Sequence, residues 1–511
     1  MSFASSNITQ PLVILQDGSG ISALYILSAL VVSFYTLFAY SNKEIYPNIP
    51  RVGPKGLARL TWTTQKVDFV INARERLREG SERYPDRPYK IFTDMGDILV
   101  IPPHYMEELK LLASMDFKAS ASDVSQSFCG PFRVDTDLEY RTCTHSLIGP
   151  LSLEACAAVE DNLKASDEYY EISLDTVSLL VSRMGSRVFM GPELSADPRW
   201  PKASTDYVQA AFATAYLISI FPRVIRPYIS WLLPPTYLVR HRMARCQAIL
   251  KPHIDNRAAA KAAAAARGEP DPYNSSIEWF ERECSPDHNP TDYQITLNLV
   301  AIHTTSDLLF QALIDIAKHP EIIAPLREEL INVLPSTGLN KAGLSKLELM
   351  DSCFKETQRC RPVATALFRR LALSDVKLSD GFVVKKGSKV IVDANRLQSP
   401  ELYEDPDKWD PYRFMRLRRV PGEEGRASLV SSTQSHFGFG YGIHACPGRF
   451  FAANLVKVAM AHLLLKYDFA IPEGQRELGG MVIGSNHVAH PKARLLIKSR
   501  RPEIDIDSLP I

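Results

Sequence analysis

The hydrophobic and polar positions divide the chain into one uninterrupted apolar run near its start and a long body in which both kinds of residue are mixed. Residues 21–40 contain no charged side chain. As a helix, this run would be roughly 30 Å long, about the thickness of the hydrocarbon core of a bilayer. A buried core helix or a cleaved signal peptide would also be apolar, but residues 1–20 lack the Lys or Arg that begins a signal peptide. The pattern favours a retained transmembrane anchor.

The charges beside the apolar run predict its orientation. Lys43, Arg51 and Lys55 follow the run, whereas Asp17 precedes it. Because positively charged flanks stay in the cytoplasm, we expect a single-pass protein of the endoplasmic reticulum membrane. Residues 1–20 would lie on the lumenal side and the catalytic body on the cytoplasmic side.

Three short segments flank the body in the predicted organisation. Asn7 begins an Asn-Ile-Thr sequon in the lumenal segment and is a predicted glycosylation site. Residues 41–55 form a linker whose prolines prevent the anchor helix from continuing. Residues 56–500 would then form one large domain, followed by a C-terminal tail at residues 501–511.

The body is predicted to be mainly helical with a minor β component. Apolar β-type runs at residues 89–92 and 98–101 flank a turn and indicate a hairpin, and residues 376–393 are typical of strand and turn. Asn289 followed by a proline is typical of a helix start, and the helix would run to about His319.

The composition is that of a globular protein with a large core. Hydrophobic residues make up 45% and charged residues 23% of the 511 positions. Lys and Arg together number 59 and Asp and Glu 58, a balance that argues against nucleic-acid binding. The eight cysteines form no Cys-x-x-Cys pair, which indicates reduced, mostly buried thiols in a reducing compartment.

One cysteine differs from the others in its surroundings. Cys446 lies within residues 437–451, a segment with four glycines and one proline that leads into an apolar helical pattern. A thiolate at a helix N-terminus is stabilised by backbone N–H groups and by the positive end of the helix dipole. Glycines also allow the backbone to approach a flat ligand closely. A buried structural cysteine in a glycine-rich turn would explain Cys446 alone, but not the spacing of its neighbours.

That spacing matches the pattern Phe-x-x-Gly-x-His/Arg-x-Cys-x-Gly at every fixed position, in Phe439, Gly442, His444, Cys446 and Gly448. The segment resembles the heme loop of the cytochrome P-450 family. The resemblance implies a cytochrome P-450 fold and a heme b whose iron is ligated by Cys446. It also implies that Phe439 packs on the proximal face and that His444 contacts a heme propionate. A thiolate ligand on heme iron favours cleavage of the O–O bond.

Two further segments resemble parts of the same family. Glu356 and Arg359 are three residues apart and would share a helical face, although such a pair alone is common on protein surfaces. Residues 409–414 resemble the family's Phe-x-Pro-x-Arg-Phe segment, with Trp409 in place of the first phenylalanine. The resemblance implies that Glu356, Arg359 and Arg413 form a buried hydrogen-bonded cluster below the heme, with a structural role.

The middle of the long predicted helix resembles the family's Ala-Gly-x-Asp/Glu-Thr-Thr/Ser stretch. Ala301 occupies the small position and Thr304 the hydroxyl position. A hydroxyl there can pass protons through hydrogen-bonded water. His303 replaces the usual acid, and histidine can also relay a proton. A threonine within a helix more often bonds its own backbone, so the assignment of Thr304 and His303 as catalytic depends on the other motifs.

The region that corresponds to the family's Trp-x-x-x-Arg helix, which flanks the heme propionates, departs from that pattern. Residues 140–145 contain no tryptophan, which leaves Arg141 or His145 as candidates there. Arg369, or its neighbour Arg370, could hold another propionate. Paired arginines at such a position also occur as solvated strand residues.

The resemblance implies a heme-thiolate monooxygenase that uses O2 and electrons from a separate NADPH-cytochrome reductase, alone or with cytochrome b5. No flavin or nicotinamide fingerprint is visible in the chain, so NADPH would act only through this partner. Arg449 is a candidate for docking it. The similarity is greatest to the fungal branch, which implies a lipophilic, terpenoid-like secondary metabolite as substrate. Loops near residues 115–135, 205–225 and 365–370 would line its pocket.

Two other functions stay open on the sequence alone. A heme-thiolate isomerase or dehydratase would keep the cysteine loop without inserting oxygen, and Thr304 argues against it. A non-catalytic membrane heme binder would tolerate the loss of Thr304, whereas a monooxygenase would not.

Overall fold

The computed structural model describes the body of the chain. The described residues are Ser28, 45–54, 62–93, 95–125, 148–219, 221, 225–283, 289–476, 478 and 480–510. The predicted glycosylation site Asn7, the predicted anchor apart from Ser28, and the propionate candidates Arg141 and His145 lie outside these residues.

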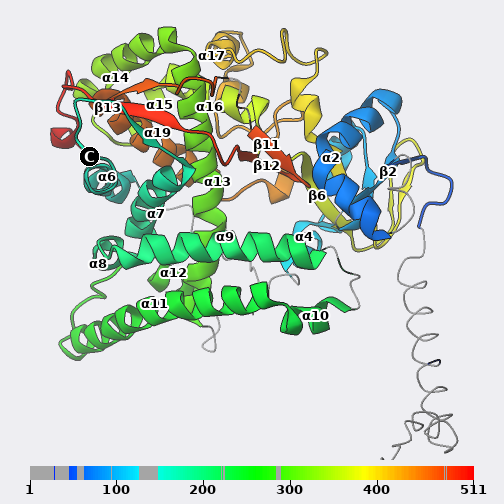
Figure 1. The fold of residues 1–511 in the computed structure, drawn as a ribbon, viewed down its shortest axis with the longest axis horizontal. Helices are drawn as coiled ribbons and strands as arrows, with labels where there is room; N and C mark the ends of the chain where they lie inside the picture. The colour runs from blue at the N-terminus through cyan, green and yellow to red at the C-terminus, as the bar shows by residue number, and fades with distance from the viewer. Residues whose placement is uncertain are drawn as a thin grey trace, which may run out of the picture.

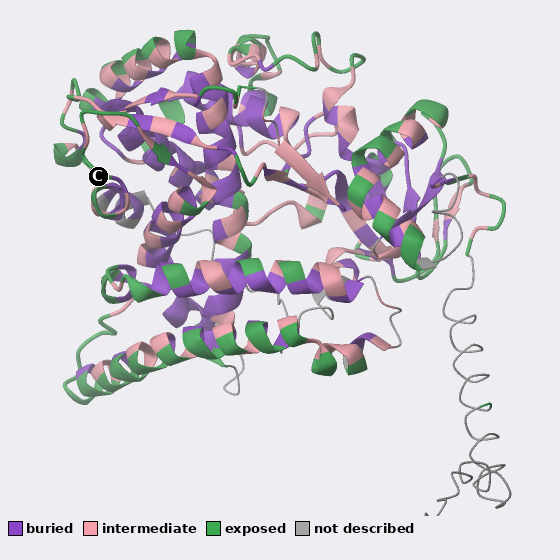
Figure 2. Cartoon of the chain, in the orientation of Figure 1, coloured by how far each residue is buried: buried purple, intermediate pink, exposed green. Residues whose placement is uncertain are grey.

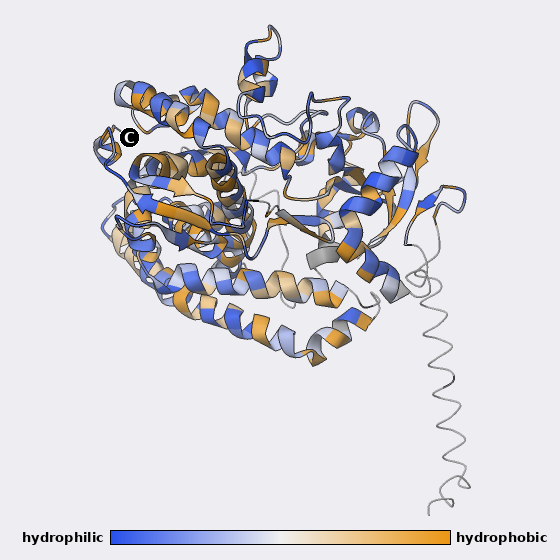
Figure 3. Ribbon diagram, turned by 45° about the horizontal axis from the view of Figure 1, so that its top comes forward, coloured by the Kyte–Doolittle hydropathy of each residue, from blue (hydrophilic) through white to orange (hydrophobic). Residues whose placement is uncertain are grey.

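Helices make up most of the described residues (Figure 1), which confirms the mainly helical prediction. Surface helices carry both hydrophilic and hydrophobic residues (Figure 3), as amphipathic helices do. The α-helices are α2 (Trp62–Arg83), α3 (Tyr105–Leu109), α4 (Phe117–Ser125), α6 (Ile148–Asn162), α7 (Leu174–Met190), α8 (Pro192–Ser195), α9 (Arg199–Ser219), α10 (Arg226–Leu232), α11 (Pro234–Ala266), α12 (Ser276–Glu283), α13 (Pro290–Lys318), α14 (Ile323–Thr337), α15 (Lys341–Lys346), α16 (Glu348–Cys360), α17 (Arg413–Arg418), α18 (Glu424–Ala427) and α19 (Arg449–Lys466). Short 3-10 helices are η3 (Pro320–Ile322), η4 (Ala394–Gln398), η5 (Gly442–His444) and η6 (Ile506–Ser508).

The strands form one larger sheet and several small ones. A six-stranded sheet has the order β1-β2-β3-β9-β6-β4, and β10-β13-β5, β11-β12 and β7-β8 form smaller sheets. The strand bounds are β1 (Arg51–Val52), β2 (Tyr89–Thr93), β3 (Gly96–Val100), β4 (Met115–Asp116), β5 (Tyr170–Ile172), β6 (Ala366–Ala372), β7 (Val376–Lys377), β8 (Val383–Val384), β9 (Lys389–Asp393), β10 (Tyr467–Ala470), β11 (Gly480–Ile483), β12 (Asn486–Ala489) and β13 (Leu495–Ser499). The predicted hairpin is confirmed, because β2 and β3 pair antiparallel with Tyr89 opposite Val100.

The long helix α13 runs through the middle of the molecule and crosses α9 and α11 (Figure 1). Its predicted start is confirmed, because the Asn289 side chain accepts a hydrogen bond from the Thr291 amide at 3.1 Å. By length and composition, α13 is the one helix among the described residues that could cross a membrane, but 67% of its most apolar window is buried. Its contact with α7 is close, since a Cβ on Gly185 would lie 2.8 Å from Ile302 Cδ1. Burial along its length (Figure 2) identifies α13 as a core helix.

The C-terminal residues pack onto the domain and do not form a separate tail. Ile506 is buried, and the Leu339 amide donates a hydrogen bond to the Pro510 carbonyl oxygen at 2.8 Å. Lys466 of α19 pairs with Asp507 at 2.8 Å. Residues 501–511 form a short segment with several charged residues, so the sequence pattern does not predict that its apolar side chains pack against the domain.

Candidate active site

The loop before α19 turns back so that Cys446 and Phe439 are neighbours. The Cys446 amide donates a hydrogen bond to the Phe439 carbonyl oxygen at 2.7 Å, and the Arg449 guanidinium donates to the Cys446 carbonyl oxygen at 2.8 Å. Gly440 and Gly442 have φ angles of +75° and +76°, a region that glycine adopts without strain. Cys446 is half-buried and precedes the first turn of α19.

Glycine suits positions 442 and 448 of the pattern for different structural reasons. At Gly442, a Cβ would overlap the carbonyl oxygen of Lys110, so the loop could not lie as close to α3 with any other residue. At Gly448, φ is −81°, which suits any residue. A Cβ there would lie 4.0 Å from the Cys446 Sγ. Glycine at this position therefore keeps one flank of the sulfur open.

A cluster on α3 fixes the loop from outside. The Tyr441 hydroxyl donates to Glu107 Oε1 at 2.5 Å, the Lys110 ammonium lies 5.1 Å from the Tyr441 ring centroid, and the Ile443 amide donates to the Lys110 carbonyl oxygen at 3.0 Å. Glu107, Lys110 and Tyr441 are not among the residues predicted from the sequence. No local pattern signals them, because the contact joins positions 334 residues apart.

Phe439 and His444 occupy different surroundings on the same loop. Phe439 is half-buried and packs against the main core cluster. The His444 ring lies 6.3 Å from the ring of Phe117 in α4. The His444 ring therefore lies near α4, a helix outside the motif.

Of the two neighbouring arginines of β6, Arg370 has the buried guanidinium. It donates to the Tyr441 carbonyl oxygen at 2.8 Å, whereas the Arg369 Nε donates to the Ala366 carbonyl oxygen at 3.0 Å. The Arg370 Nε is buried without a hydrogen-bond partner among the described residues, and burial lowers the pKa of Arg370 to about 10. A bulge in β6, with Phe368 at φ +52°, shifts the alternation of the strand.

The middle of α13 has an uncovered strip. Thr304 is exposed and Val300 is 38% exposed, while Ile302 and Thr305 on other faces are buried. The Thr304 hydroxyl donates to the Val300 carbonyl oxygen at 3.1 Å, the backbone bond that is common for threonine within helices. Its oxygen lone pairs stay available as acceptors.

His303 faces α9. Its ring centroid lies 5.3 Å from that of Phe212, and burial lowers the pKa of His303 below its ordinary value. The imidazole is therefore neutral at neutral pH, so one ring nitrogen donates and the other accepts.

The structure brings Glu356, Arg359 and Arg413 together. Arg359 donates to both Glu356 carboxylate oxygens at 2.8 Å each, and the Arg413 Nε donates to them at 3.1 and 3.2 Å. Arg359 also donates to the carbonyl oxygens of Leu397 and Pro406 at 3.0 and 2.7 Å. Glu356 and Arg359 are 0% exposed, and the Arg413 side chain is 11% exposed, so one buried carboxylate pairs with two guanidinium groups.

Comparison with known proteins identifies the family. A cytochrome P-450 family profile matches residues 207–481. The cytochrome P-450 monooxygenase eqxH of Fusarium heterosporum is 40% identical over 481 residues, which cover 90% of this chain and 92% of that protein. This chain belongs to the cytochrome P-450 family. Another similar monooxygenase, hepE of Aspergillus oryzae, is 36% identical over 471 residues, covering 88% of this chain and 86% of that one.

The cytochrome P-450 fold is also confirmed by a solved structure. The retinoic acid-bound cyanobacterial CYP120A1 matches with a TM-score of 0.64 and 18% identity, covering 89% of this chain and all of that one. Together these similarities show a cytochrome P-450 monooxygenase whose relatives belong to fungal secondary metabolism.

The family implies a heme with a thiolate ligand, and the residues of this site fit it on two observations. Cys446 lies beside the N-terminus of α19, and Gly448 leaves one flank of its sulfur open. Arg370 is a buried cation whose Nε has no hydrogen-bond partner in the part of the chain that the structure describes, which suits an anionic group such as a heme propionate.

The Glu356 cluster makes a stability prediction. Replacing Glu356 by Gln keeps the shape of the side chain but leaves two guanidinium groups without their carboxylate. We expect the free energy of unfolding to fall by about 3–5 kcal/mol. Denaturant unfolding of Glu356→Gln and heme content per chain would measure the loss. Glu423→Gln, which removes a surface pair with Arg426 at 2.6 Å, is the matched control. Equal unfolding midpoints for the two variants would contradict the prediction.

Proposed function

We propose that this monooxygenase oxidises a lipophilic, terpenoid-like small molecule at a heme b ligated by Cys446. The uncovered strip of α13 supports this most directly. Its partly exposed side chains are Val300 and Thr304, and Val363, in the segment between α16 and β6, is likewise 37% exposed. Apolar surface beside a single hydroxyl suits a substrate with few polar groups.

The heme is proposed to rest between the cysteine loop and α13. When bound, it supplies the activation of O2 and the transfer of one oxygen atom to the substrate. Cys446 would hold the iron, and the N-terminus of α19 would stabilise the thiolate charge. Phe439 would cover the proximal face. Gly442 keeps the loop tight, and Gly448 leaves room at the sulfur.

The propionate contacts are assigned to His444 and to Arg370 in place of Arg369. The buried, partly unpartnered guanidinium of Arg370 supports this choice. Arg369 points back to its own strand through its bond to Ala366. Glu356, Arg359 and Arg413 would support the loop without touching the cofactor.

Thr304 and His303 are proposed to handle protons. The Thr304 hydroxyl donates a hydrogen bond to the Val300 carbonyl oxygen. The lone pairs of its oxygen can therefore accept a hydrogen bond from water in the uncovered strip. His303 carries no charge at neutral pH, because burial lowers its pKa. Its neutral imidazole has one N–H group and one acceptor nitrogen, so it can take part in proton transfer without placing a permanent charge near an apolar substrate.

A separate NADPH-cytochrome reductase, alone or with cytochrome b5, would supply the electrons. Arg449 supports a docking surface near the cysteine loop. Its guanidinium bonds the Cys446 carbonyl oxygen and lies 4.7 Å from the ring centroid of the exposed Phe450. A cation and an aromatic ring beside the proposed ligand would suit an acidic partner surface.

We propose a location at the endoplasmic reticulum membrane, with residues 21–40 as the anchor and Asn7 glycosylated in the lumen. An apolar patch on α10 and the start of α11 supports membrane contact. Trp231 and Leu232 are 66% and 75% exposed, and the Arg240 guanidinium lies 4.3 Å from the Trp231 ring centroid. Other exposed members of the patch are Tyr228, Tyr237 and Leu238. Such aromatic residues favour the bilayer interface.

The membrane contact can be measured by fluorescence. In nanodiscs made with brominated lipid, the bromine atoms should quench Trp231. The extra quenching, relative to ordinary lipid, should disappear in Trp231→Phe and persist in Trp279→Phe, whose tryptophan is buried. Identical quenching in wild type and Trp231→Phe would place α10 away from the bilayer.

The catalytic proposal is tested at Thr304. In Thr304→Ala, with reductase and a true substrate, we expect product per NADPH consumed to fall by roughly 10-fold or more, because proton delivery is impaired. Thr296→Ala is the matched control, since Thr296 bonds the Asp292 carbonyl oxygen at 2.8 Å on the same helix. Unchanged coupling in Thr304→Ala would refute the role of the hydroxyl. Turnover by wild type without NADPH or O2 consumption would favour an isomerase or dehydratase.

A further inference from the structure

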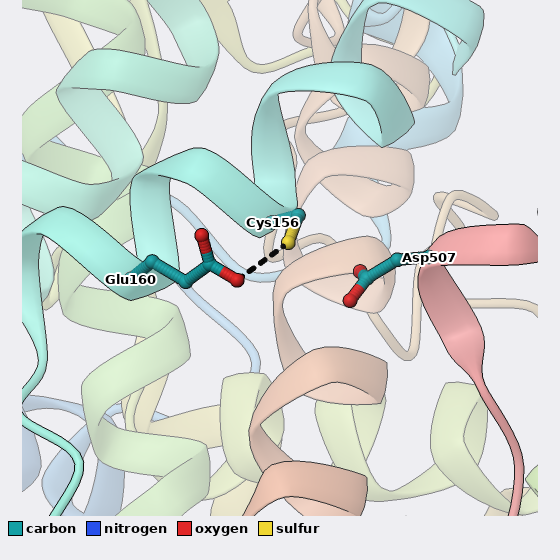
Figure 4. A group of neighbouring side chains, drawn as sticks. All are labelled: Cys156, Glu160 and Asp507. Atoms are coloured by element: carbon teal, nitrogen blue, oxygen red, sulfur yellow. Dashed lines mark hydrogen bonds between the residues drawn. The ribbon is translucent and has the colours of Figure 1, made fainter.

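Ionisable side chains form a surface cluster where α6 meets the C-terminal residues. Cys156, Glu160 and Asp507 point toward one another there (Figure 4), and the Cys156 thiol donates to Glu160 at 3.1 Å. The Lys466 ammonium lies 2.8 Å from Asp507 Oδ2 and 3.5 Å from the Cys156 Sγ, so it supplies the positive charge of the cluster. Glu160 and Asp507 are exposed. The cluster serves as a contact that holds the C-terminal residues to α6 and α19.

Asp307 of α13 is a different kind of acid, because it is buried inside the domain. It is 4% exposed, and its two hydrogen-bond partners are uncharged. The Asp307 Oδ1 accepts a hydrogen bond from the Ala489 amide of β12 at 2.7 Å, and Oδ2 accepts one from Gln311 Nε2. A buried carboxylate that is held by neutral groups is costly, and this cost favours a proton on the carboxyl group.

Helix geometry places Asp307 beside the uncovered strip of α13. At about 100° per residue, Asp307 points between the directions of His303 and Thr304, one turn further along the helix. Helical side chains lean toward the N-terminus of their helix, so the carboxyl group leans back toward these two residues. The bond to Ala489 shows that β12 covers the helix at this point. Asp307 therefore lies where the uncovered strip ends and β12 begins to cover α13.

Gln311 can bond Asp307 in either protonation state. Its Nε2 donates to the Asp307 carboxylate, while its Oε1 is buried without a hydrogen-bond partner among the residues that the structure describes. A half-turn of the amide group exchanges these two atoms, and Oε1 can then accept a hydrogen bond from a protonated Asp307. Because one amide atom bonds the carboxyl group in each orientation, the pair suits an acid that gains and loses a proton.

The surroundings of Asp307 bring its proton exchange close to neutral pH. Burial raises the pKa of Asp307 to about 6, although its two hydrogen bonds and the charge of Arg361 favour the carboxylate. Arg361 also pairs with Asp315 of α13. In β12, burial and the charge of Arg361 lower the pKa of His487 to about 4. His487 is therefore neutral and Arg361 charged around pH 6, so neither side chain changes its charge where Asp307 does.

We propose that Asp307 is the acid that supplies protons to Thr304 and His303, in place of the acid that the family pattern has at position 303. The inference rests on the proposed function. A protonated Asp307 releases its proton to water that is hydrogen-bonded to the Thr304 hydroxyl, and Gln311 turns its Nε2 back to the carboxylate. The carboxylate then recovers a proton from solvent water, so Asp307 is unchanged after each turnover. A substrate that excludes water from the strip favours the protonated form.

Infrared titration of the full-length holoenzyme tests whether Asp307 holds a proton. The C=O band of a protonated carboxyl group should appear in wild type as the pH falls through the Asp307 pKa of about 6, and should be lost in Asp307→Asn. The asparagine can still accept from the Ala489 amide and donate to Gln311 Oε1, so the fold should be kept. Asp292→Asn is the matched control and should keep the band. Asp292 of the same helix also accepts from a glutamine amide, that of Gln247, at 2.9 Å.

A second variant tests the same acid without replacing it. Gln311→Met removes a hydrogen bond that favours the Asp307 carboxylate. The pKa of Asp307 should therefore rise, and the infrared band should appear at higher pH than in wild type.

Product formed per NADPH consumed, with reductase and a true substrate, tests whether the proton is delivered. In Asp307→Asn we expect this ratio to fall by roughly 10-fold or more, whereas Asp292→Asn should match wild type. The wild-type ratio should decrease as the pH rises through the pKa of Asp307, and Asp307→Asn should lose this pH dependence. Asp307→Glu keeps an acid, so it should recover part of the ratio and its pH dependence.

Contrary results would overturn the proposal. Identical infrared titrations of wild type and Asp307→Asn would show that Asp307 does not take up a proton. Unchanged coupling in Asp307→Asn, or a loss that Asp307→Glu does not reverse, would show that Asp307 serves only to hold β12. If Thr304→Ala keeps wild-type coupling while Asp307→Asn loses it, the role of the hydroxyl fails and the role of the acid stands. Turnover without NADPH consumption would refute the proposed function, and the infrared titration would still report on Asp307 by itself.

Discussion

The buried carboxylate of Glu356 is the interaction on which the cysteine side of the structure depends. It holds Arg359 from its own helix and Arg413 from a segment far along the chain, and Arg359 in turn binds the backbone at Leu397 and Pro406. One turn of α16 therefore fixes a long irregular stretch that has few regular hydrogen bonds of its own. Irregular backbone at this depth needs such partners, because buried carbonyl oxygens without donors are costly.

Other residues of α16 also hold the irregular backbone, in segments that lie closer along the chain to Cys446. The Lys355 ammonium, whose pKa burial lowers to about 7, donates to the carbonyl oxygens of Ser428 and Ser431 at 2.7 and 3.0 Å. Gln358 packs so closely on Gly438 that a Cβ there would overlap its side chain. The helix thus supports the chain from residue 397 up to the loop that carries the thiol. The position of Cys446 therefore depends on the contacts of α16 as much as on the glycines beside it.

Much of this could be predicted from the sequence where the determinants are local. The cap at Asn289, the β2–β3 hairpin and the spacing around Cys446 each depend on a few adjacent residues. The partnership of Glu356 with Arg413 needed the family resemblance, because no periodicity links positions 57 residues apart. Which of Arg369 and Arg370 is buried could not be predicted, since it depends on a bulge and on the positive φ of Phe368.

His303 shows how the departure from the family's acid fits its surroundings. A carboxylate at this position would stay charged unless burial raised its pKa strongly, and it would be costly against the ring of Phe212. An imidazole in the same place loses its charge, because burial lowers its pKa, and still keeps one donor and one acceptor. The exchange leaves a side chain that can donate and accept a hydrogen bond on the helix, and it makes the surface toward α9 more apolar. Under the proposed function, proton transfer and an apolar substrate surface would share one turn of α13, which an acidic residue would not allow as readily.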